Sequence, residues 1–370
     1  MVKNEEYTGT VSALGSDGEG IITTQDGTVF VPYCLTGEVV RYKVLSVKGR
    51  VAYGKVMQVI EVSPDRVTPG CPVFGKCGGC SLQHMSYSAQ ADYKRTVVAN
   101  ALYKIGGISC EVLPTEKSPQ SYCYRNKLAL PVGWQNGKNV VGFYAMRSHR
   151  IVPITECAIQ RGWSRKVIFC LTEFMDKSGL CGYDEETKKG DIRRVVARDT
   201  GAGIIVAVVA AKTVDISAFA DSLERELGSV SVLLNINGGT GNAIFGERFI
   251  TVKGSGFFTS EDMGIKFRAG ANTFLQVNDG IKQRLYKKVT EEAAGHGVAV
   301  DLYSGGGMLT ALLAKECGLA YGVEAVKRLR YAQTNLKRLT GWTVKCSIYA
   351  ARWKTNFPRC LPQRKIRGAL

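Results

Sequence analysis

The order strand, glycine-rich loop, helix, strand between Val298 and Glu324 restricts the fold more than any other feature of this sequence. We expect a buried strand from Val298, a helix over Met308–Glu316 and a second strand over Ala320–Val323. This is the first β-α-β unit of a doubly wound sheet, in which ligands bind at the carboxyl ends of the strands. The sequence therefore predicts a Rossmann-like α/β domain over residues 261–341.

The loop Ser304-Gly-Gly-Gly307 and the acid after the second strand indicate the ligand. Glycines let the backbone approach a bound molecule, and Glu324, 23 residues after Asp301, can accept hydrogen bonds from both ribose hydroxyls. The loop is not Gly-x-Gly-x-x-Gly and no Lys-Ser/Thr follows it, which disfavours dinucleotides and P-loop nucleotides. S-adenosylmethionine, with a ribose but no phosphate, fits better. The alternative is a simple turn without ligand.

Just upstream, Ala271–Asn278 carries three amide side chains around Phe274. It is either part of a site or the exposed start of a helix. Asn278 suits the cap of a helix over Ile281–Glu292, because asparagine accepts a backbone N–H at this position.

Three cysteines, Cys71, Cys77 and Cys80, lie within ten residues, and the glycines between them allow a tight wrap. Three thiols on a loop, completed by a distant fourth, can hold an iron–sulfur cluster or a structural zinc. Cys157 is our candidate for the fourth ligand, although spacing alone does not select it. The alternative is a set of unligated buried thiols. A chain of this length, with irregular cysteine spacing and no signal peptide, is expected in a reducing, cytoplasmic compartment.

Residues 1–63 predict a small barrel of the OB type, because about five short strands alternate with glycine-containing turns. The expected strands are Thr8–Leu14, Gly20–Thr24, Thr28–Pro32, Glu38–Val47 and Val51–Val62. Cations are interleaved with aromatic residues between Arg41 and Lys55, with no acid among them, which suits single-stranded nucleic acid. They are Arg41, Tyr42, Lys43, Lys48, Arg50, Tyr53 and Lys55. The alternative is a structural barrel with a solvated strand face.

The formal charge of +17 points toward a polyanionic partner, but it is unevenly distributed. Residues 325–370 hold twelve Lys or Arg and no acid, so the rest of the chain has 37 basic against 32 acidic residues. The nucleic-acid interpretation therefore depends on local patches. No apolar run reaches the length of a membrane span. Residues 64–260 are expected as a central α+β domain with helices over Ser86–Ile105 and Ser217–Leu227, and a strand-helix alternation is expected from about Phe257.

Four groups of residues, in this order along the chain, resemble the class I RNA uracil-C5 methyltransferases of bacteria, most closely the 23S rRNA branch with an N-terminal TRAM barrel. They are the four cysteines, Tyr124-Arg125-Asn126-Lys127, Phe274-Leu275-Gln276-Val277-Asn278 and Asp301-Leu-Tyr-Ser-Gly-Gly-Gly. The resemblance covers residues 5–340.

The resemblance implies a [4Fe–4S] cluster on Cys71, Cys77, Cys80 and Cys157. It implies S-adenosylmethionine contacts from Gln276, Tyr303 and Glu324, and a helical segment over residues 82–105 that can pack with the catalytic domain. The related tRNA enzymes lack the barrel and the cluster, so 23S ribosomal RNA is the expected substrate, and a monomer the expected state.

In this family a cysteine thiolate adds to C6 of uracil, C5 attacks the methyl group, and a carboxylate removes the C5 proton. The segments that carry this cysteine and carboxylate in the family do not occur in residues 1–370. Cys317, Cys346 and Cys360 lack the required context, so the catalytic residues are unknown. We therefore expect residues 342–370 to be an aberrant basic tail, from a shifted reading frame or a truncation, and the chain as written to be inactive. The alternative is that this tail is an RNA-binding extension.

Two other functions are compatible with these residues. One is a TRAM-containing methylthiotransferase, although its Cys-x-x-x-Cys-x-x-Cys motif is absent. The other is a non-catalytic RNA-binding iron–sulfur protein.

Overall fold

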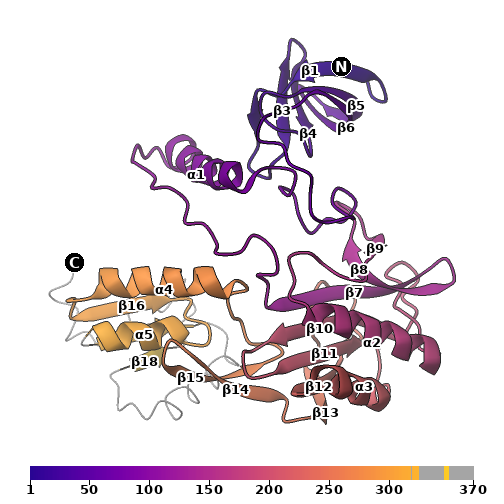
Figure 1. The fold of residues 1–370 in the computed structure, drawn as a ribbon, viewed down its shortest axis with the longest axis vertical. Helices are drawn as coiled ribbons and strands as arrows, with labels where there is room; N and C mark the ends of the chain where they lie inside the picture. Colours follow the sequence, from indigo (N-terminus) through magenta and orange to yellow (C-terminus); the bar gives the residue numbers. More distant parts are fainter. Residues whose placement is uncertain (318, 325–345, 350–370) are drawn as a thin grey trace. The chain divides into compact units, whose positions relative to one another are not determined.

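The computed structural model describes residues 1–317, 319–324 and 346–349 (Figure 1). It divides into two compact units, Met1–Ser121 with Gly142–Ala158, and Tyr122–Val141 with Ile159–Leu370. These units do not coincide with the domains 1–63, 64–260 and 261–341, which stay predictions. Among the described helices, none has the length and apolar character needed to cross a membrane.

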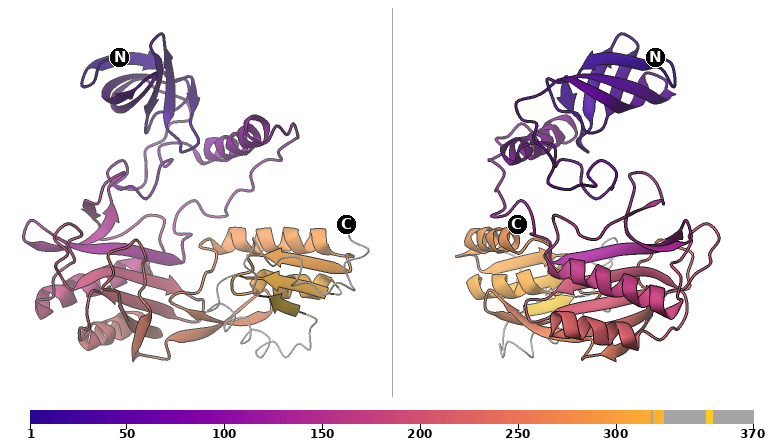
Figure 2. Two further views of the ribbon diagram at one scale, coloured as in Figure 1. Left: turned by 180° about the vertical axis from the view of Figure 1, so that it is seen from behind. Right: turned by 45° about the vertical axis from the view of Figure 1, so that its right-hand side comes forward.

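The first unit contains a six-stranded sheet in the order β1-β5-β6-β4-β3-β2. Figure 2 shows these N-terminal strands, in indigo, curving around one another. Its strands are β1 (Glu6–Thr10), β2 (Ala13–Leu14), β3 (Gly20–Thr24), β4 (Gly27–Val31), β5 (Val39–Lys48) and β6 (Val51–Glu61). The strands at the two ends of this order, β1 and β2, are separated only by Val11 and Ser12. One short segment therefore pairs with both edges and closes the sheet into a barrel, around a core that includes Val29, Val40 and Tyr42.

Glu38, which precedes β5, fastens the end of this barrel. Its side chain is fully buried, and its carboxylate accepts hydrogen bonds from the Arg66 guanidinium at 2.5 and 2.7 Å and from the Leu35 N–H at 2.8 Å. Arg66 also donates to the carbonyl of Tyr33 at 2.9 Å. A buried carboxylate is tolerated when it is paired and hydrogen-bonded in this way. The pair ties the chain after the barrel back to the barrel.

Beyond the barrel, the first unit contains one helix and part of a hairpin. Helix α1 (Tyr87–Lys104) follows Ser86, whose hydroxyl accepts the N–H of Ala89 at 3.3 Å, so the predicted helix is confirmed. Strand β8 (Lys138–Tyr144) passes from the second unit into the first, where it pairs with β9 (Ile151–Pro153).

The second unit is built on a sheet in the order β13-β12-β11-β10-β7-β8. Only β11 and β12 are parallel, and helices α2 and α3 cover one face (Figure 1). All seven residues of β11 are buried, because the other face is also covered, by a cluster that includes Ala271. The elements are β7 (Lys127–Gln135), α2 (Trp163–Ser178), β10 (Ile192–Asp199), β11 (Ile204–Ala210), α3 (Ser217–Leu227), β12 (Val230–Ile236) and β13 (Arg248–Lys253).

The rest of the second unit contains the predicted β-α-β unit, which is confirmed. Strands β16, β17 and β18 are parallel, and Asp301 of β16 lies beside Gly322 of β17. The alternation begins later than predicted, because residues 257–270 form an antiparallel hairpin, β14 with β15. The elements are β14 (Phe257–Asp262), β15 (Ile265–Gly270), α4 (Asp279–Ala293), β16 (Val298–Leu302), α5 (Met308–Glu316), β17 (Leu319–Val323) and β18 (Cys346–Tyr349).

Strand β18 falls within residues 342–370, which we expected to be an aberrant tail. Its pairing with β17 shows that these four residues continue the parallel sheet. The remainder of that expected tail lies outside the described residues.

The Glu38–Arg66 pair makes the stability of the barrel depend on pH. Burial raises the pKa of Glu38, but hydrogen bonds from Arg66 and from backbone N–H groups outweigh it, so the pKa lies below its ordinary value. A lowered pKa contributes stability that is present above the unfolded-state pKa and is lost as the pH falls through the folded-state pKa. We expect Glu38→Gln to cost about 3 kcal/mol at neutral pH and to flatten this acid dependence. Denaturation at a series of pH values measures both effects.

The matched control is Glu61→Gln, at the exposed end of β6. We expect this change to leave the stability and its pH dependence as in the wild type. An unchanged acid dependence in Glu38→Gln would show that the pair does not control the acid stability of the barrel.

Candidate functional site

A cavity of ≈ 270 Å³ lies at the carboxyl end of β16. Its lining comes from β15, from Thr273–Gln276, from α4 and from the loop that follows Asp301. This is where a doubly wound fold binds its ligands. Of the three predicted cofactor contacts, Gln276 and Tyr303 line the cavity, whereas Glu324 does not.

The glycine loop has a backbone that few residues adopt. Gly305 and Gly307 have φ values of 55° and 84°, and Tyr303 has a φ of 63°, which is uncommon outside glycine. The Ser304 N–H donates to the carbonyl of Val323 at 3.1 Å, so the loop is held to the end of β17. A Cβ added at Gly306 would meet no atom within 4 Å. The loop is therefore closely held and leaves open space beside Gly306.

Two buried carboxylates lie behind this loop. Asp301 accepts a hydrogen bond from the hydroxyl of Thr310 at 2.6 Å. Burial of Asp301 and the charge of Glu324 raise the pKa of Asp301, although the hydrogen bonds from Thr310 act in the opposite direction. Glu324 is 7% exposed and accepts the N–H of Gly305 at 2.9 Å. Glu324 thus does not line the cavity itself but holds Gly305, which does.

The two motifs that contain Asn126 and Gln276 lie together in the structure. Asn126 is buried, and its Nδ2 donates to the carbonyl of Gln276 and to Oδ1 of Asp279, both at 3.0 Å. The Asn126 N–H donates to the carbonyl of Val277, also at 3.0 Å. Asn278 caps α4 as predicted, since its Oδ1 accepts the N–H of Ile281 at 3.2 Å.

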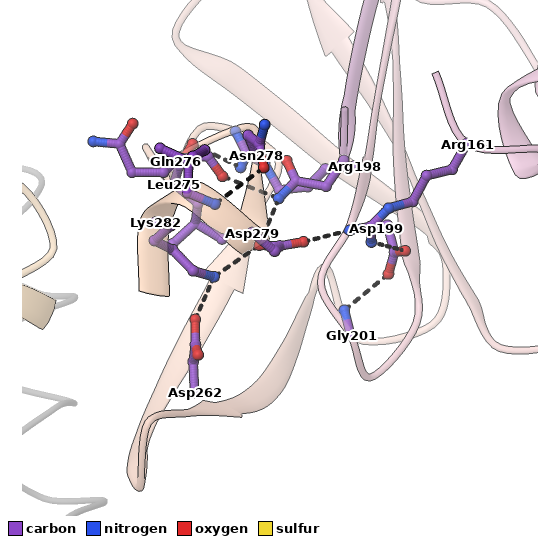
Figure 3. A network of polar contacts seen from close by, with 12 residues as sticks. Arg161, Arg198, Asp199, Gly201, Asp262, Leu275, Gln276, Asn278, Asp279 and Lys282 are labelled. Carbon is purple, nitrogen blue, oxygen red and sulfur yellow. Dashed lines mark hydrogen bonds and ion pairs between the residues drawn. The ribbon is translucent and has the colours of Figure 1, made fainter. Parts of the chain in front are cut away.

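Asp279 is the centre of a network of charges (Figure 3). Its carboxylate pairs with Arg161 at 2.6 Å and with Lys282 at 2.7 Å. Arg161 also pairs with Asp199 at 2.8 Å, and Lys282 with Asp262. Burial raises the pKa of Asp279, but Lys282, Asn126 and Arg161 together lower it below its ordinary value. The carboxylate is therefore charged, and it joins α4 to the central sheet and to β14.

Arg198 of β10 lies beneath the same segment. Its side chain is 1% exposed, and one Nη donates to the carbonyl of Leu275 at 3.4 Å. Burial lowers the pKa of Arg198 to about 10, against the opposite effect of Asp279. Sequence reasoning did not single out Arg198, although an arginine inside a buried strand is itself a signal.

All four predicted cluster cysteines lie in the first unit. Cys77 is buried and accepts the N–H of Gly79 at 3.3 Å, and burial, with the charges of Cys157 and Cys71, raises its pKa. Within the described part of the chain, no three Cys, His, Asp or Glu side chains converge as metal ligands do.

Cys317 ends α5 in surroundings that do not suit a nucleophile. Its thiol is 4% exposed and donates to the carbonyl of Ala293 at 3.1 Å, and burial raises its pKa. Cys346 begins β18, and Cys360 lies outside the described residues. Accordingly, no described residue is assigned as nucleophile.

The predicted nucleic-acid face of the barrel is partly corrected. Tyr42 is 1% exposed and belongs to the barrel core, so it cannot stack on a base. Tyr53 stacks on Phe30 with ring centroids 5.7 Å apart. Lys43 of β5 lies directly opposite Lys55 of β6, so two cations of the predicted set do share a face.

No family model matches the chain. A protein named as an uncharacterized RNA methyltransferase from Halalkalibacterium halodurans is 36% identical over 348 residues, which cover 92% of this chain and 76% of the relative. A second, of the same description, from Clostridium tetani is 36% identical over 334 residues, covering 88% of this chain and 72% of the relative.

Among solved structures, the tRNA (uracil-54, C5)-methyltransferase of Pyrococcus abyssi, in complex with S-adenosyl-L-homocysteine, matches with a TM-score of 0.74. The match covers 93% of this chain and 79% of that one at 24% identity, and it shows a common fold. With the two bacterial relatives covered over more than two thirds of their length, this chain belongs to the RNA methyltransferase family.

Proposed function

We propose that this protein transfers a methyl group from S-adenosylmethionine to C5 of a uridine in 23S ribosomal RNA. The observation that carries the proposal is the cavity at the carboxyl end of β16, bounded by the glycine loop and by Thr273–Gln276. Membership of the RNA methyltransferase family supports the reaction class. The resemblance of the motifs supports uracil as the target nucleobase and 23S ribosomal RNA as the substrate.

The residues around the cavity fit S-adenosylmethionine, which supplies an electrophilic methyl group when bound. The open space beside Gly306 admits a ligand against the loop backbone. Gln276 and Tyr303 line the cavity and offer an amide and a phenol as polar contacts. Glu324 holds Gly305, and since a carboxylate accepts several hydrogen bonds it can hold the loop and a ribose hydroxyl together.

The first prediction from this proposal concerns Gly306→Ala. The new methyl group meets no protein atom, so the free energy of unfolding should stay unchanged. The methyl group occupies the space left for the cofactor, so the affinity for S-adenosylhomocysteine should fall by about tenfold or more. Calorimetric titration and thermal unfolding measure the two quantities. Gly297→Ala, also in open space but before β16, should change neither; equal affinities of all three proteins would remove Gly306 from the site.

The choice of uracil C5 follows from the chemistry that the motifs imply. C5 becomes nucleophilic only after a thiolate has added to C6, and a base must then take the C5 proton so that the thiolate can leave. The target uracil must also leave the stack of neighbouring nucleobases to reach an enclosed cavity. We assign the binding of the cofactor to described residues. We assign no described residue as the attacking thiolate or as the acceptor of the C5 proton.

Tritium at C5 of uracil provides a direct measurement. Nothing in the comparisons supports the expectation that the chain is inactive, and its relatives are named as RNA methyltransferases. We therefore propose that the protein, with S-adenosylmethionine, releases tritium to water from 23S RNA that carries 5-tritiated uracil, and releases much less from tRNA. RNA with tritium at C6 is the control, because that hydrogen is retained. Transfer of methyl groups without release of C5 tritium would refute uracil C5 as the target, and faster release from tRNA would refute the choice of RNA.

We further propose that Cys71, Cys77, Cys80 and Cys157 hold a [4Fe–4S] cluster. Support comes from the resemblance of the motifs, from the presence of all four cysteines in the first unit, and from the N–H that Gly79 donates to the Cys77 sulfur. Because no three of the described side chains converge as metal ligands do, the proposal requires the four thiols to be drawn together by the cluster. Hydrogen bonds of this kind are one way in which proteins adjust the potential of such clusters. Gly78 packs closely here, since a Cβ would lie 2.9 Å from the carbonyl oxygen of Tyr144.

Anaerobically purified protein should therefore contain about four irons per chain. Cys77→Ser should lose this iron, whereas Cys110→Ser, an exposed cysteine outside the set, should keep it. Metal analysis of the three proteins decides the question. Stoichiometric zinc without iron, or full iron in Cys77→Ser, would refute the cluster.

A further inference from the structure

Three consecutive backbone carbonyls on one side of the candidate cofactor site are held by Asn126, just before β7, and by Arg198 of β10. Those of Gln276 and Val277 accept from the side chain and the backbone of Asn126, both at 3.0 Å. That of Leu275 accepts from Arg198 at 3.4 Å (Figure 3). These contacts substitute for the regular hydrogen bonds that an isolated loop lacks.

Because these carbonyls are held on the side of Asn126 and Arg198, the backbone of Leu275 and Gln276 has a fixed orientation beside the cavity. Leu275 and Gln276 line the cavity, and the Gln276 side chain points away from Arg198 (Figure 3). The bond from Asn126 fixes the direction of the Gln276 carbonyl and so restrains the backbone from which this side chain projects. The orientation of Gln276 thus depends on the contacts made by its own backbone.

The amide of Asn126 has a single favourable orientation. Its Nδ2 faces two acceptors, the carbonyl of Gln276 and a carboxylate oxygen of Asp279. A flipped amide would place Oδ1 against both of these acceptors, which removes a donor from the carbonyl of Gln276 and brings oxygen against the Asp279 carboxylate. Because Asp279 is itself held by Arg161 and Lys282, the donor in front of Gln276 is fixed by the charge network.

We propose that Asn126 is a positioning residue, which acts through the backbone of Gln276 to hold that side chain toward the cofactor. This inference rests on the proposed function, because it takes S-adenosylmethionine as the ligand of the cavity. Asn126 itself is not among the residues that line the cavity.

A double-mutant cycle on the full chain, with S-adenosylhomocysteine as the probe, tests the proposal. Asn126→Asp keeps the shape but replaces the donor by an acceptor, so affinity should fall by about tenfold. Gln276→Ala removes the side chain that is positioned. If Asn126 acts through Gln276, adding Asn126→Asp to Gln276→Ala should cost little further affinity, because the two effects are not additive.

The chain contains a matched control in Asn235. This residue is also buried, and its Nδ2 likewise donates to two acceptors, the carbonyls of Gly246 and Arg248, at 3.1 and 3.0 Å. Asn235→Asp should lower the thermal stability yet leave the affinity unchanged. Should Asn126→Asp not fold, Asn126→Ala serves in the cycle, because it removes the donors without adding charge and keeps the backbone bond to Val277.

The outcomes separate this proposal from the proposed function. Wild-type binding with a non-additive cycle supports both. Wild-type binding with additive losses, or an equal loss of affinity in Asn235→Asp, overturns the positioning role alone. A wild-type chain that does not bind S-adenosylhomocysteine overturns both.

Discussion

The candidate site depends on the ion pairs and hydrogen bonds made by the half-buried carboxylate of Asp279. It stands at the start of α4 and meets Arg161, Lys282 and the amide of Asn126. A carboxylate taken out of water is stable only when such partners replace its hydration. The same contacts bring together the residue before β7, the loop before α2 and the first turn of α4. The cavity wall at Gln276 is one consequence of satisfying this charge.

Local patterns predicted the regular elements well. The helices over Ser217–Leu227 and Met308–Glu316 have the predicted limits, because apolar periodicity and flanking glycines are local signals. The cap at Asn278 is of the same kind. The hairpin over residues 257–270 was missed, since short strands with a tight turn resemble the start of a strand-helix unit until their partners are known.

The candidate site was predictable only in part. Gln276 and Tyr303 lie where the motifs place them, whereas the contact of Glu324 with Gly305 depends on how the loop turns back over β17. The roles of Asn126 and Arg198 could not be read from the sequence, because each contacts residues far along the chain and no periodicity records such pairs. The expectation that Tyr42 is available to stack on a base was wrong. Side chains alternate between the two faces of a strand, and Tyr42 lies on the face of β5 that packs into the barrel core.

The closure of the barrel by residues 6–14 has a consequence for the order in which it can be assembled during synthesis. Strands β2, β3 and β4 are neighbours in sequence and can pair as soon as they leave the ribosome. Strand β1 must wait for β5, so the first strand to be made is among the last to find its partner. Until then both its edge and that of the growing sheet are exposed to other chains. The last strand to be made, β6, then pairs with both β4 and β5, so the barrel is complete only when this strand has been inserted.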